Sequence, residues 1–276
     1  MRIMFSAARG RFVLCNSARA TAMAATLACA FVASLSGPAA AEQAAAPQPK
    51  GADLSADLSD NKSKILVELF TSQGCVSCPP ADGFFATLAE DSRVIALSLH
   101  VDYWDYIGWE DSFGNSDFTE RQKSYARAIG SRTIYTPQFI IDGVERIEGF
   151  DPEKTLAALT AKQGAPSPVQ LSVSRIGGDL VIRAEADPPL SAPVRLELVR
   201  YMPQATVSIE RGENAGKTVT YRNIVTSWQT LGDWSGTAPL ELTVPAGDAA
   251  PAVAIVQDVD AGSGGPGQIL AAVSAD

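Results

Sequence analysis

Apolar and polar positions over residues 63–163 follow a strand period and a helix period in turn. Ile65–Phe70 and Val94–Val101 are apolar runs of strand length, typical of strands that are covered on both faces. Between them, residues 83–90 carry apolar side chains at helical spacing. A strand, a helix and a second strand in this order predict a right-handed crossover unit.

The pattern continues with two further helices and a hairpin. Helices are predicted over Phe118–Ile129 and Asp151–Lys162, and an apolar strand over Gln138–Ile141. Asp142–Gly143 is a hairpin signal, and Val144–Ile147 supplies the returning strand. The order strand, helix, strand, helix, strand, strand, helix is the minimal thioredoxin topology. We therefore predict an α/β thioredoxin-like domain (βαβαββα) over this region.

Residues 164–276 alternate apolar and polar side chains instead. Ala165–Pro168 marks the boundary, and Gly177–Asp179 predicts a hairpin. Many short strands with regular turn signals predict a second, all-β, sandwich-like C-terminal domain. The polar stretch Gly212–Lys217 is expected to be a hairpin tip. The predicted strands are Val169–Val173, Leu180–Ala184, Val194–Val199, Thr206–Glu210, Val219–Trp228, Leu240–Val244, Val253–Asp258 and Ile269–Val273.

The amino terminus has the pattern of an export signal. Residues 1–41 combine four Arg and no acid with an apolar stretch from about residue 20 to 35, and they end in Pro38–Ala41, an Ala-x-Ala cleavage site. The apolar stretch is short for a membrane span, and Cys29 lacks the leucine of a lipid-attachment motif. Residues 42–62 are predicted to be a flexible linker. We expect a periplasmic or secreted protein with no stable membrane anchor after signal cleavage.

Removal of this segment changes the charge and the cysteine content. The whole chain has 22 Lys and Arg against 31 Asp and Glu, so after residues 1–41 it keeps 18 against 31, a net charge of −13. This balance argues against nucleic acid as a partner, because no basic patch is available for phosphates. Cys15 and Cys29 leave with the signal, so Cys75 and Cys78 are the cysteines of the mature chain.

These two cysteines stand between the first predicted strand and the first predicted helix. A close thiol pair at a helix N-terminus is typical of a redox-active dithiol, because the helix dipole stabilises a thiolate. Pro79 and Pro80 follow at once, which moves the helix start and makes Cys78 the expected N-cap. We predict Cys75 as the nucleophile. An inert disulfide would constrain very little chain.

Thr136–Pro137 opens the third predicted strand, beside the dithiol in this topology. A cis Thr136–Pro137 bond, which X-Pro bonds tolerate, would place the Thr136 backbone next to the cysteines, where an extended substrate segment can pair with it. An ordinary trans proline at a strand start is the alternative. We therefore predict Cys75, Cys78, Thr136 and Pro137 as the catalytic residues.

His100, the one histidine of the chain, ends the second predicted strand. With Cys75 and Cys78 it would suit a soft metal such as copper or zinc, although copper chaperones space their cysteines differently. The alternative is a histidine that is hydrogen-bonded at a strand end. Asp102 and Asp105 are interpreted as solvated loop acids. The nearby Tyr and Trp side chains are either a rim for a partner peptide or packing over the sheet.

Three stretches, Phe70–Asp82, Ser98–Asp105 and Tyr135–Gln138, together resemble an uncharacterised secreted bacterial family, domain of unknown function 1223. That family belongs to the thioredoxin-like superfamily, and the resemblance runs from about Lys64 to the carboxyl end. It implies the fold, export and a dithiol site, and it supplies no substrate.

The sequence thus predicts an exported thiol–disulfide oxidoreductase that uses the Cys75/Cys78 dithiol on protein disulfides and requires no cofactor. Its partners would be protein thiols and disulfides. One alternative is a metal-binding or metallochaperone protein whose site is Cys75, Cys78 and His100. Another is a non-catalytic binding module, in which the β domain carries the function and the cysteines stay oxidised. The β domain would cap the dithiol, recruit a partner or only stabilise the first domain.

Overall fold

The computed structural model describes residues 63–247 and 250–275. The predicted signal peptide and the predicted linker lie outside the described residues. Up to Lys162 the elements follow in the expected order: β1 (Ile65–Thr71), α2 (Pro79–Leu88), β2 (Val94–His100), the short 3-10 helix η1 (Asp105–Ile107), α3 (Ser116–Ala128), β3 (Gln138–Ile141), β4 (Glu145–Glu148) and α4 (Pro152–Lys162). The later strands are β5 (Val169–Ile176), β6 (Asp179–Ala186), β7 (Val194–Ser208), β8 (Thr218–Trp234), β9 (Leu240–Pro245), β10 (Ala252–Val259) and β11 (Pro266–Ala275).

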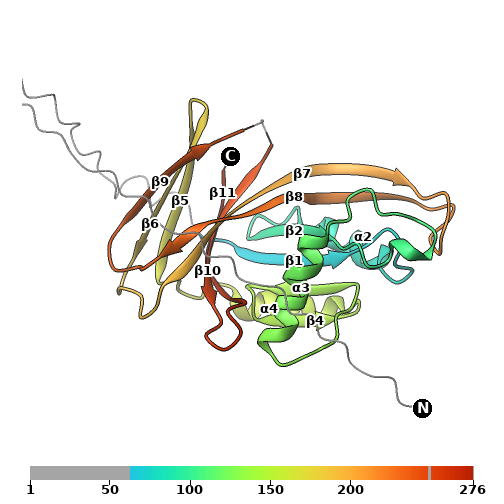
Figure 1. The fold of residues 1–276 in the computed structure, drawn as a ribbon, viewed down its shortest axis with the longest axis horizontal. Coiled ribbons are helices and arrows are strands. Elements are labelled where there is room, and N and C mark those ends of the chain that lie inside the picture. Colours follow the sequence, from blue (N-terminus) through green and yellow to red (C-terminus); the bar gives the residue numbers. More distant parts are fainter. Residues whose placement is uncertain (1–62, 248–249, 276) are drawn as a thin grey trace, which may run out of the picture. The chain divides into compact units, whose positions relative to one another are not determined.

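These strands do not divide into two domains. β8 runs parallel to β2, with Ser98 opposite Ile224, and this contact joins strands of both halves of the chain. The resulting eight-stranded sheet has the order β11-β10-β7-β8-β2-β1-β3-β4, and β5, β6 and β9 form a three-stranded sheet (Figure 1). The predicted fold class, a thioredoxin-like βαβαββα domain over 63–163 followed by a separate β-sandwich over 164–276, is therefore wrong.

The reason lies in the lengths of β7 and β8. The sequence predicted short strands over Val194–Val199 and Val219–Trp228, whereas β7 has 15 residues and β8 has 17. The two strands run side by side past the smaller sheet toward α2 (Figure 1). All residues of β2 are buried, and an uncovered edge would leave its backbone groups unpaired. β8 covers that edge, where Asn223 Nδ2 also donates to Ala96 O at 2.9 Å.

A shared core crosses the predicted domain boundary. Side chains alternate along β1, so that Val67 and Leu69 pack with Phe85 of α2 and Leu159 of α4. On the opposite face of β1, the core combines residues from both halves of the chain. They are Leu66, Phe70, Ile95, Leu97, Leu99, Val101, Phe118, Tyr125, Ile140, Val199, Val225, Val253, Ile255, Ile269 and Ala272. The halves therefore bury one hydrophobic cluster together.

A buried ion pair of the first half is joined to residues of the second half across the same boundary. Glu68 of β1 is fully buried, and Arg121 of α3 donates to its carboxylate from Nε at 2.7 Å and from Nη2 at 3.0 Å. Tyr125 OH donates to the same carboxylate at 2.6 Å and accepts from Gln257 Nε2 of β10 at 2.9 Å. The Arg121 guanidinium also lies 3.5 Å from the centre of the Trp228 ring of β8. We refer to these five residues as the Glu68 network.

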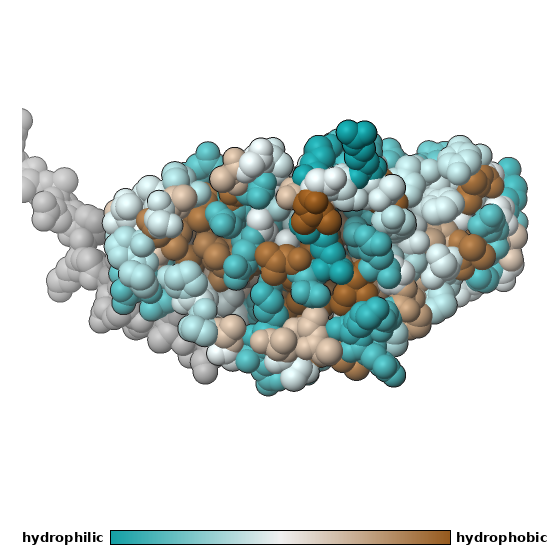
Figure 2. Space-filling view, turned by 90° about the horizontal axis from the view of Figure 1, so that it is seen from below, coloured by the Kyte–Doolittle hydropathy of each residue, from teal (hydrophilic) through white to brown (hydrophobic). Residues whose placement is uncertain are grey.

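The surface seen from below in Figure 2 is mostly hydrophilic, and its hydrophobic residues lie in small groups between hydrophilic ones. Among the described large hydrophobic side chains, Tyr106 is the most exposed, at 82%, and it lies on η1. Val76, between the two cysteines, is 55% exposed. On the face that Figure 2 shows, the apolar side chains are scattered between hydrophilic ones.

Two glycine substitutions, one at the contact and one as a control, test how closely the β3–β4 hairpin approaches β11. Gly143 has a φ of 74°, and an added Cβ would overlap Gly267 O. We expect Gly143→Ala to lower the free energy of unfolding by about 2–4 kcal/mol, because strain at positive φ adds to overpacking. Gly83→Ala, in α2 with nothing within 4 Å of the added Cβ, should instead raise it by about 0.5–1 kcal/mol. Urea denaturation measures both, and equal effects would contradict the close contact.

Candidate dithiol site

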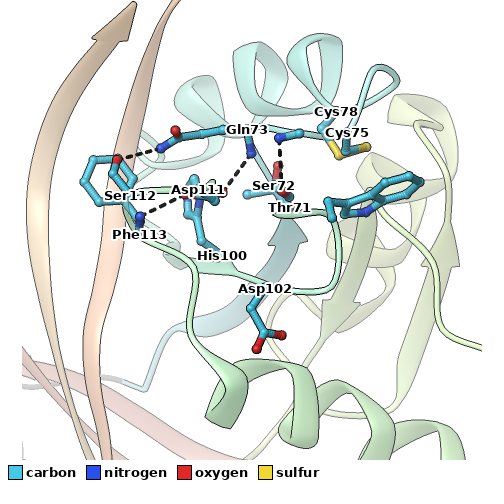
Figure 3. Close-up of polar contacts among 12 residues, drawn as sticks. Thr71, Ser72, Gln73, Cys75, Cys78, His100, Asp102, Asp111, Ser112 and Phe113 are labelled. Atoms are coloured by element: carbon cyan, nitrogen blue, oxygen red, sulfur yellow. Dashed lines mark hydrogen bonds and ion pairs between the residues drawn. A yellow bond between two sulfur atoms is a disulfide. The ribbon is translucent and has the colours of Figure 1, made fainter. Parts of the chain in front are cut away.

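Cys75 and Cys78 are joined by a disulfide in the turn between β1 and α2 (Figure 3). Their Cα atoms lie 5.4 Å apart, and Cys78 N donates to Cys75 O at 3.2 Å. The two cysteines are at most 1% exposed, while Val76 and Ser77 between them are exposed. The spacer is thus the part of the disulfide loop that reaches the surface.

Cys78 is the N-cap of α2, as predicted. It has helical φ and ψ of −77° and −37°, its side chain makes no capping hydrogen bond, and Pro79 begins the helix. Pro79 and Pro80 have no N–H, and Asp82 N donates to Cys78 O at 3.0 Å. The amide that this end of the helix offers to a thiolate is therefore that of Ala81. A Cys78 thiolate would lie at the positive end of the helix dipole.

The Thr136–Pro137 bond is cis, as predicted, and it lies beside the disulfide. Cys75 Sγ is 3.6 Å from Thr136 O, and Ser77 Oγ donates to the same carbonyl at 3.4 Å. Trp104 Nε1 donates to Thr136 Oγ1 at 2.6 Å. The structure therefore brings together all four residues that the sequence predicted as catalytic.

His100 does not join the cysteines in a metal-binding group. Its Nδ1 lies 2.8 Å from Asp111 Oδ2, both side chains are fully buried, and the ring packs against Phe113 and Tyr221 with centroids 5.2 and 4.7 Å apart. Among residues 63–247 and 250–275, no group of three or more His, Cys, Asp or Glu side chains is placed to hold a metal ion. The structure shows the alternative, a hydrogen-bonded histidine at a strand end. Copper or zinc binding stays a prediction.

Asp82 is a buried acid in the first turn of α2. It lies one turn after Cys78, so both side chains are on one face of α2. Thr71 Oγ1 donates to its Oδ1 at 2.8 Å, and Oδ2 is buried with no partner among the described residues. Burial raises the pKa of Asp82 from 3.8 to about 7, while the nearby His100 acts to lower it. Asp82 can therefore exchange a proton near neutral pH.

Asp111 ties the disulfide turn to the loop that follows η1. Its Oδ2 accepts from Gln73 N at 2.8 Å, and its Oδ1 accepts from Phe113 N at 2.9 Å. Gln73 also donates to Ser112 Oγ at 3.0 Å (Figure 3). Its side-chain oxygen accepts from Trp109 Nε1 at 2.8 Å. The loop over 102–115 thus packs against Gln73, and this loop forms part of the wall of the site.

Two acids of this loop, interpreted from the sequence as solvated, are partly exposed and hydrogen-bonded within the protein. Asp102 accepts from Thr119 Oγ1 at 2.6 Å and points toward α3, away from the disulfide (Figure 3). Asp105 accepts from Asp111 N at 3.0 Å, and burial raises its pKa. Both side chains therefore help to fix the conformation of the loop.

The tip of the β7–β8 hairpin also reaches the disulfide turn, which the sequence did not reveal. We define the hairpin tip as Ile209–Lys217. Asn214, 1% exposed, donates its side-chain amide to Gln73 O at 2.9 Å and to Cys75 O at 2.8 Å. Lys217 Nζ donates to Asn214 Oδ1 at 2.8 Å. The sequence indicated this contact only through the polar character of Gly212–Lys217.

Residues 66–257 match the model of a family described as a protein of unknown function, DUF1223. The chain belongs to the DUF1223 family. A crystal structure of a protein from Agrobacterium tumefaciens is similar to this DUF1223 protein, with 32% identity and a TM-score of 0.68 over 78% of this chain and 94% of that one. HBP35 of Porphyromonas gingivalis shares the fold at 14% identity, with a TM-score of 0.56 over 77% of this chain and 74% of that one. Curated proteins give no match.

None of the described helices of this DUF1223 protein is long and apolar enough to cross a membrane.

Proposed function

We propose that this DUF1223 protein is an exported thiol–disulfide oxidoreductase that acts on protein disulfides through Cys75 and Cys78. One observation carries the proposal: the cysteine pair is closed into a disulfide at the start of α2, with Cys75 Sγ 3.6 Å from the Thr136 carbonyl. A disulfide that closes so small a ring adds little to stability. Its position at a helix N-terminus instead suits a pair that is reduced and reoxidised.

The reductive reaction starts from the dithiol. The Cys75 thiolate attacks one sulfur of a partner disulfide, a mixed disulfide forms, and the released partner thiolate takes up a proton. Cys78 then loses its proton and attacks Cys75 Sγ, which releases the second partner thiolate and closes the Cys75–Cys78 disulfide. Two electrons pass to the partner. The same steps in reverse oxidise two partner thiols.

Asp82 supports the second step. The Cys78 thiol has to lose its proton in a buried place, and burial disfavours a thiolate. Asp82 lies one helical turn away on the same face, and its pKa of about 7 lets the carboxylate accept a proton at neutral pH. The helix N-terminus stabilises the thiolate that is left behind.

Access to the cysteines is through the spacer. Because Cys75 and Cys78 are at most 1% exposed, a partner sulfur reaches Cys75 only when the loop opens toward the exposed Val76 and Ser77. The partner chain would then lie against Thr136, whose carbonyl faces both Cys75 and Ser77. This geometry favours protein partners that present an extended segment.

Turnover and trapping test the proposal. We expect the reduced protein to reduce a model protein disulfide, and Cys75→Ser to lower the turnover by at least ~100-fold, because no mixed disulfide can form. Cys78→Ser should leave mixed disulfides with partners in cells, which appear on non-reducing gels and disappear with a reductant. The double variant Cys75→Ser/Cys78→Ser, which keeps no cysteine after removal of residues 1–41, is the control.

Two results would overturn this function. One is a Cys75→Ser variant whose turnover equals that of the wild type. The other is a Cys78→Ser variant that captures no more partner than the double variant does.

A further inference from the structure

The sequence on either side of the disulfide turn contains no positively charged side chain. No Lys or Arg occurs between Lys64 and Arg93, although a thiolate is stabilised by a nearby positive charge. The buried acids around the turn work in the opposite direction. The structure brings a lysine to this place from the distant β7–β8 hairpin.

Asn214 is the link between the hairpin tip and the turn. A side-chain amide has two N–H donors and one carbonyl acceptor, and all are used here: the donors meet the carbonyl oxygens of Gln73 and Cys75, and the acceptor meets Lys217 Nζ. These three partners fix the orientation of the amide, because two carbonyls require donors and an ammonium requires an acceptor. Lys217 is therefore two hydrogen bonds from the backbone of Cys75.

The hairpin tip is itself well held. Ile209 is 1% exposed, Ile209 N donates to Lys217 O at 2.9 Å, and Gly216 N donates to Ile209 O at 2.8 Å. A Cβ added at Gly212, whose φ is 76°, would lie 3.1 Å from Trp109 Cβ. The tip thus packs against the same wall of the site that holds Gln73.

We infer that Asn214 and Lys217 belong to the dithiol site, where Asn214 positions the Cys75 turn and Lys217 stabilises the Cys75 thiolate. This inference rests on the proposed function and adds two positioning residues to it. Other titratable groups around the turn are Asp82 of α2, His100 of β2, Asp111 of the loop after η1 and Tyr221 of β8. The hairpin tip also carries the charged residues Glu210, Arg211 and Glu213. Asp111 accepts from Gln73 N and Asn214 donates to Gln73 O, so an acid and the amide that holds Lys217 both contact Gln73.

Site-resolved alkylation of the reduced protein as a function of pH tests the inference, with mass spectrometry used to follow the Cys75 peptide. We expect Lys217→Gln to raise the pKa of the Cys75 thiol by about half a unit, which is about threefold less thiolate below that pKa. Lys217→Arg should keep the wild-type value, and Lys217→Glu should raise the pKa further. Lys154→Gln, which removes an exposed lysine of α4, is the control for net charge.

Asn214→Ala should raise the same pKa at least as much as Lys217→Gln, because it frees both the turn and the lysine. The double variant Asn214→Ala/Lys217→Gln should go no further than Asn214→Ala, since the two residues act through one contact. An unchanged Cys75 pKa in Lys217→Gln, or a shift equal to that of Lys154→Gln, would overturn the inference. The measurement needs no partner protein. An unshifted Cys75 pKa in Lys217→Gln would therefore contradict this inference and leave the proposed function standing, whereas wild-type turnover in Cys75→Ser would contradict the proposed function.

Discussion

Arg121→Met is expected to lower the free energy of unfolding by about 3–5 kcal/mol, because it leaves a buried carboxylate without its counter-charge. Glu68 is fully buried and Arg121 supplies two of the hydrogen bonds to its carboxylate. Methionine has the length to fill the space but donates no hydrogen bond. Urea denaturation of the wild type and the variant, followed by circular dichroism, measures the loss.

Two further variants separate charge from packing in this experiment. Arg127→Met changes an arginine of the same helix whose side chain is 56% exposed, and it should alter stability by less than about 0.5 kcal/mol. Arg121 Nη1 also lies 3.7 Å from the carboxylate of the buried Glu197. Glu68→Leu in the Arg121→Met background removes one of the two carboxylates that lose their counter-charge and should recover at least ~1 kcal/mol. A double variant as unstable as Arg121→Met alone would show that the unpaired Glu68 carboxylate is not the cause.

Asp82 is expected to make the protein less stable as the pH rises from 4 to 7. Its folded pKa of about 7 lies above the ordinary value of 3.8, so the native state binds more protons than the unfolded chain between these values. The contribution of this group is therefore fully present below about pH 4 and is lost as the pH approaches 7. At ~1.4 kcal/mol for each pKa unit, Asp82 alone would change the free energy of unfolding by about 4 kcal/mol.

Asp82→Asn should remove this pH dependence, because asparagine does not titrate and keeps an oxygen for the Thr71 hydroxyl. Unfolding free energies of both proteins across this pH range measure the effect, and the variant should be the more stable one at pH 8. Asp117→Asn, which removes an exposed acid from the first turn of α3, is the control and should keep the wild-type slope. Equal slopes in Asp82→Asn and the wild type would contradict the raised pKa.

The local structure around the cysteines could be predicted because its signals are local. Pro79 and Pro80 set the start of α2, so Cys78 is its N-cap, and the Asp142–Gly143 pair adopts the positive φ values of a tight hairpin. The neighbourhood of Thr136–Pro137 and Cys75 followed from element order, which the structure keeps up to α4. The helix start and the hairpin turn each depend on a few adjacent residues, whereas the position of Thr136–Pro137 depends on the order of the elements.

The sheet could not be predicted in the same way, because strand partners far apart in sequence leave no mark in either strand. Nothing in Val94–His100 indicates that its free edge pairs with β8. Glu68, in the middle of an apolar run, was a signal that the sequence offered, since a buried acid requires a partner. The sequence around Arg121 does not indicate that this residue pairs with Glu68.

The covering of β2 by β8 has a consequence for how the molecule is made. Cys75 and Cys78 leave the ribosome about 140 residues before Asn214 does, and β2 precedes its partner strand by a similar length of chain. Such non-local pairing is slow compared with the closing of a local turn. The contacts that Asn214 and β8 add to the disulfide turn and to β2 can therefore form only after the chain has been made past Asn214 and Ile224.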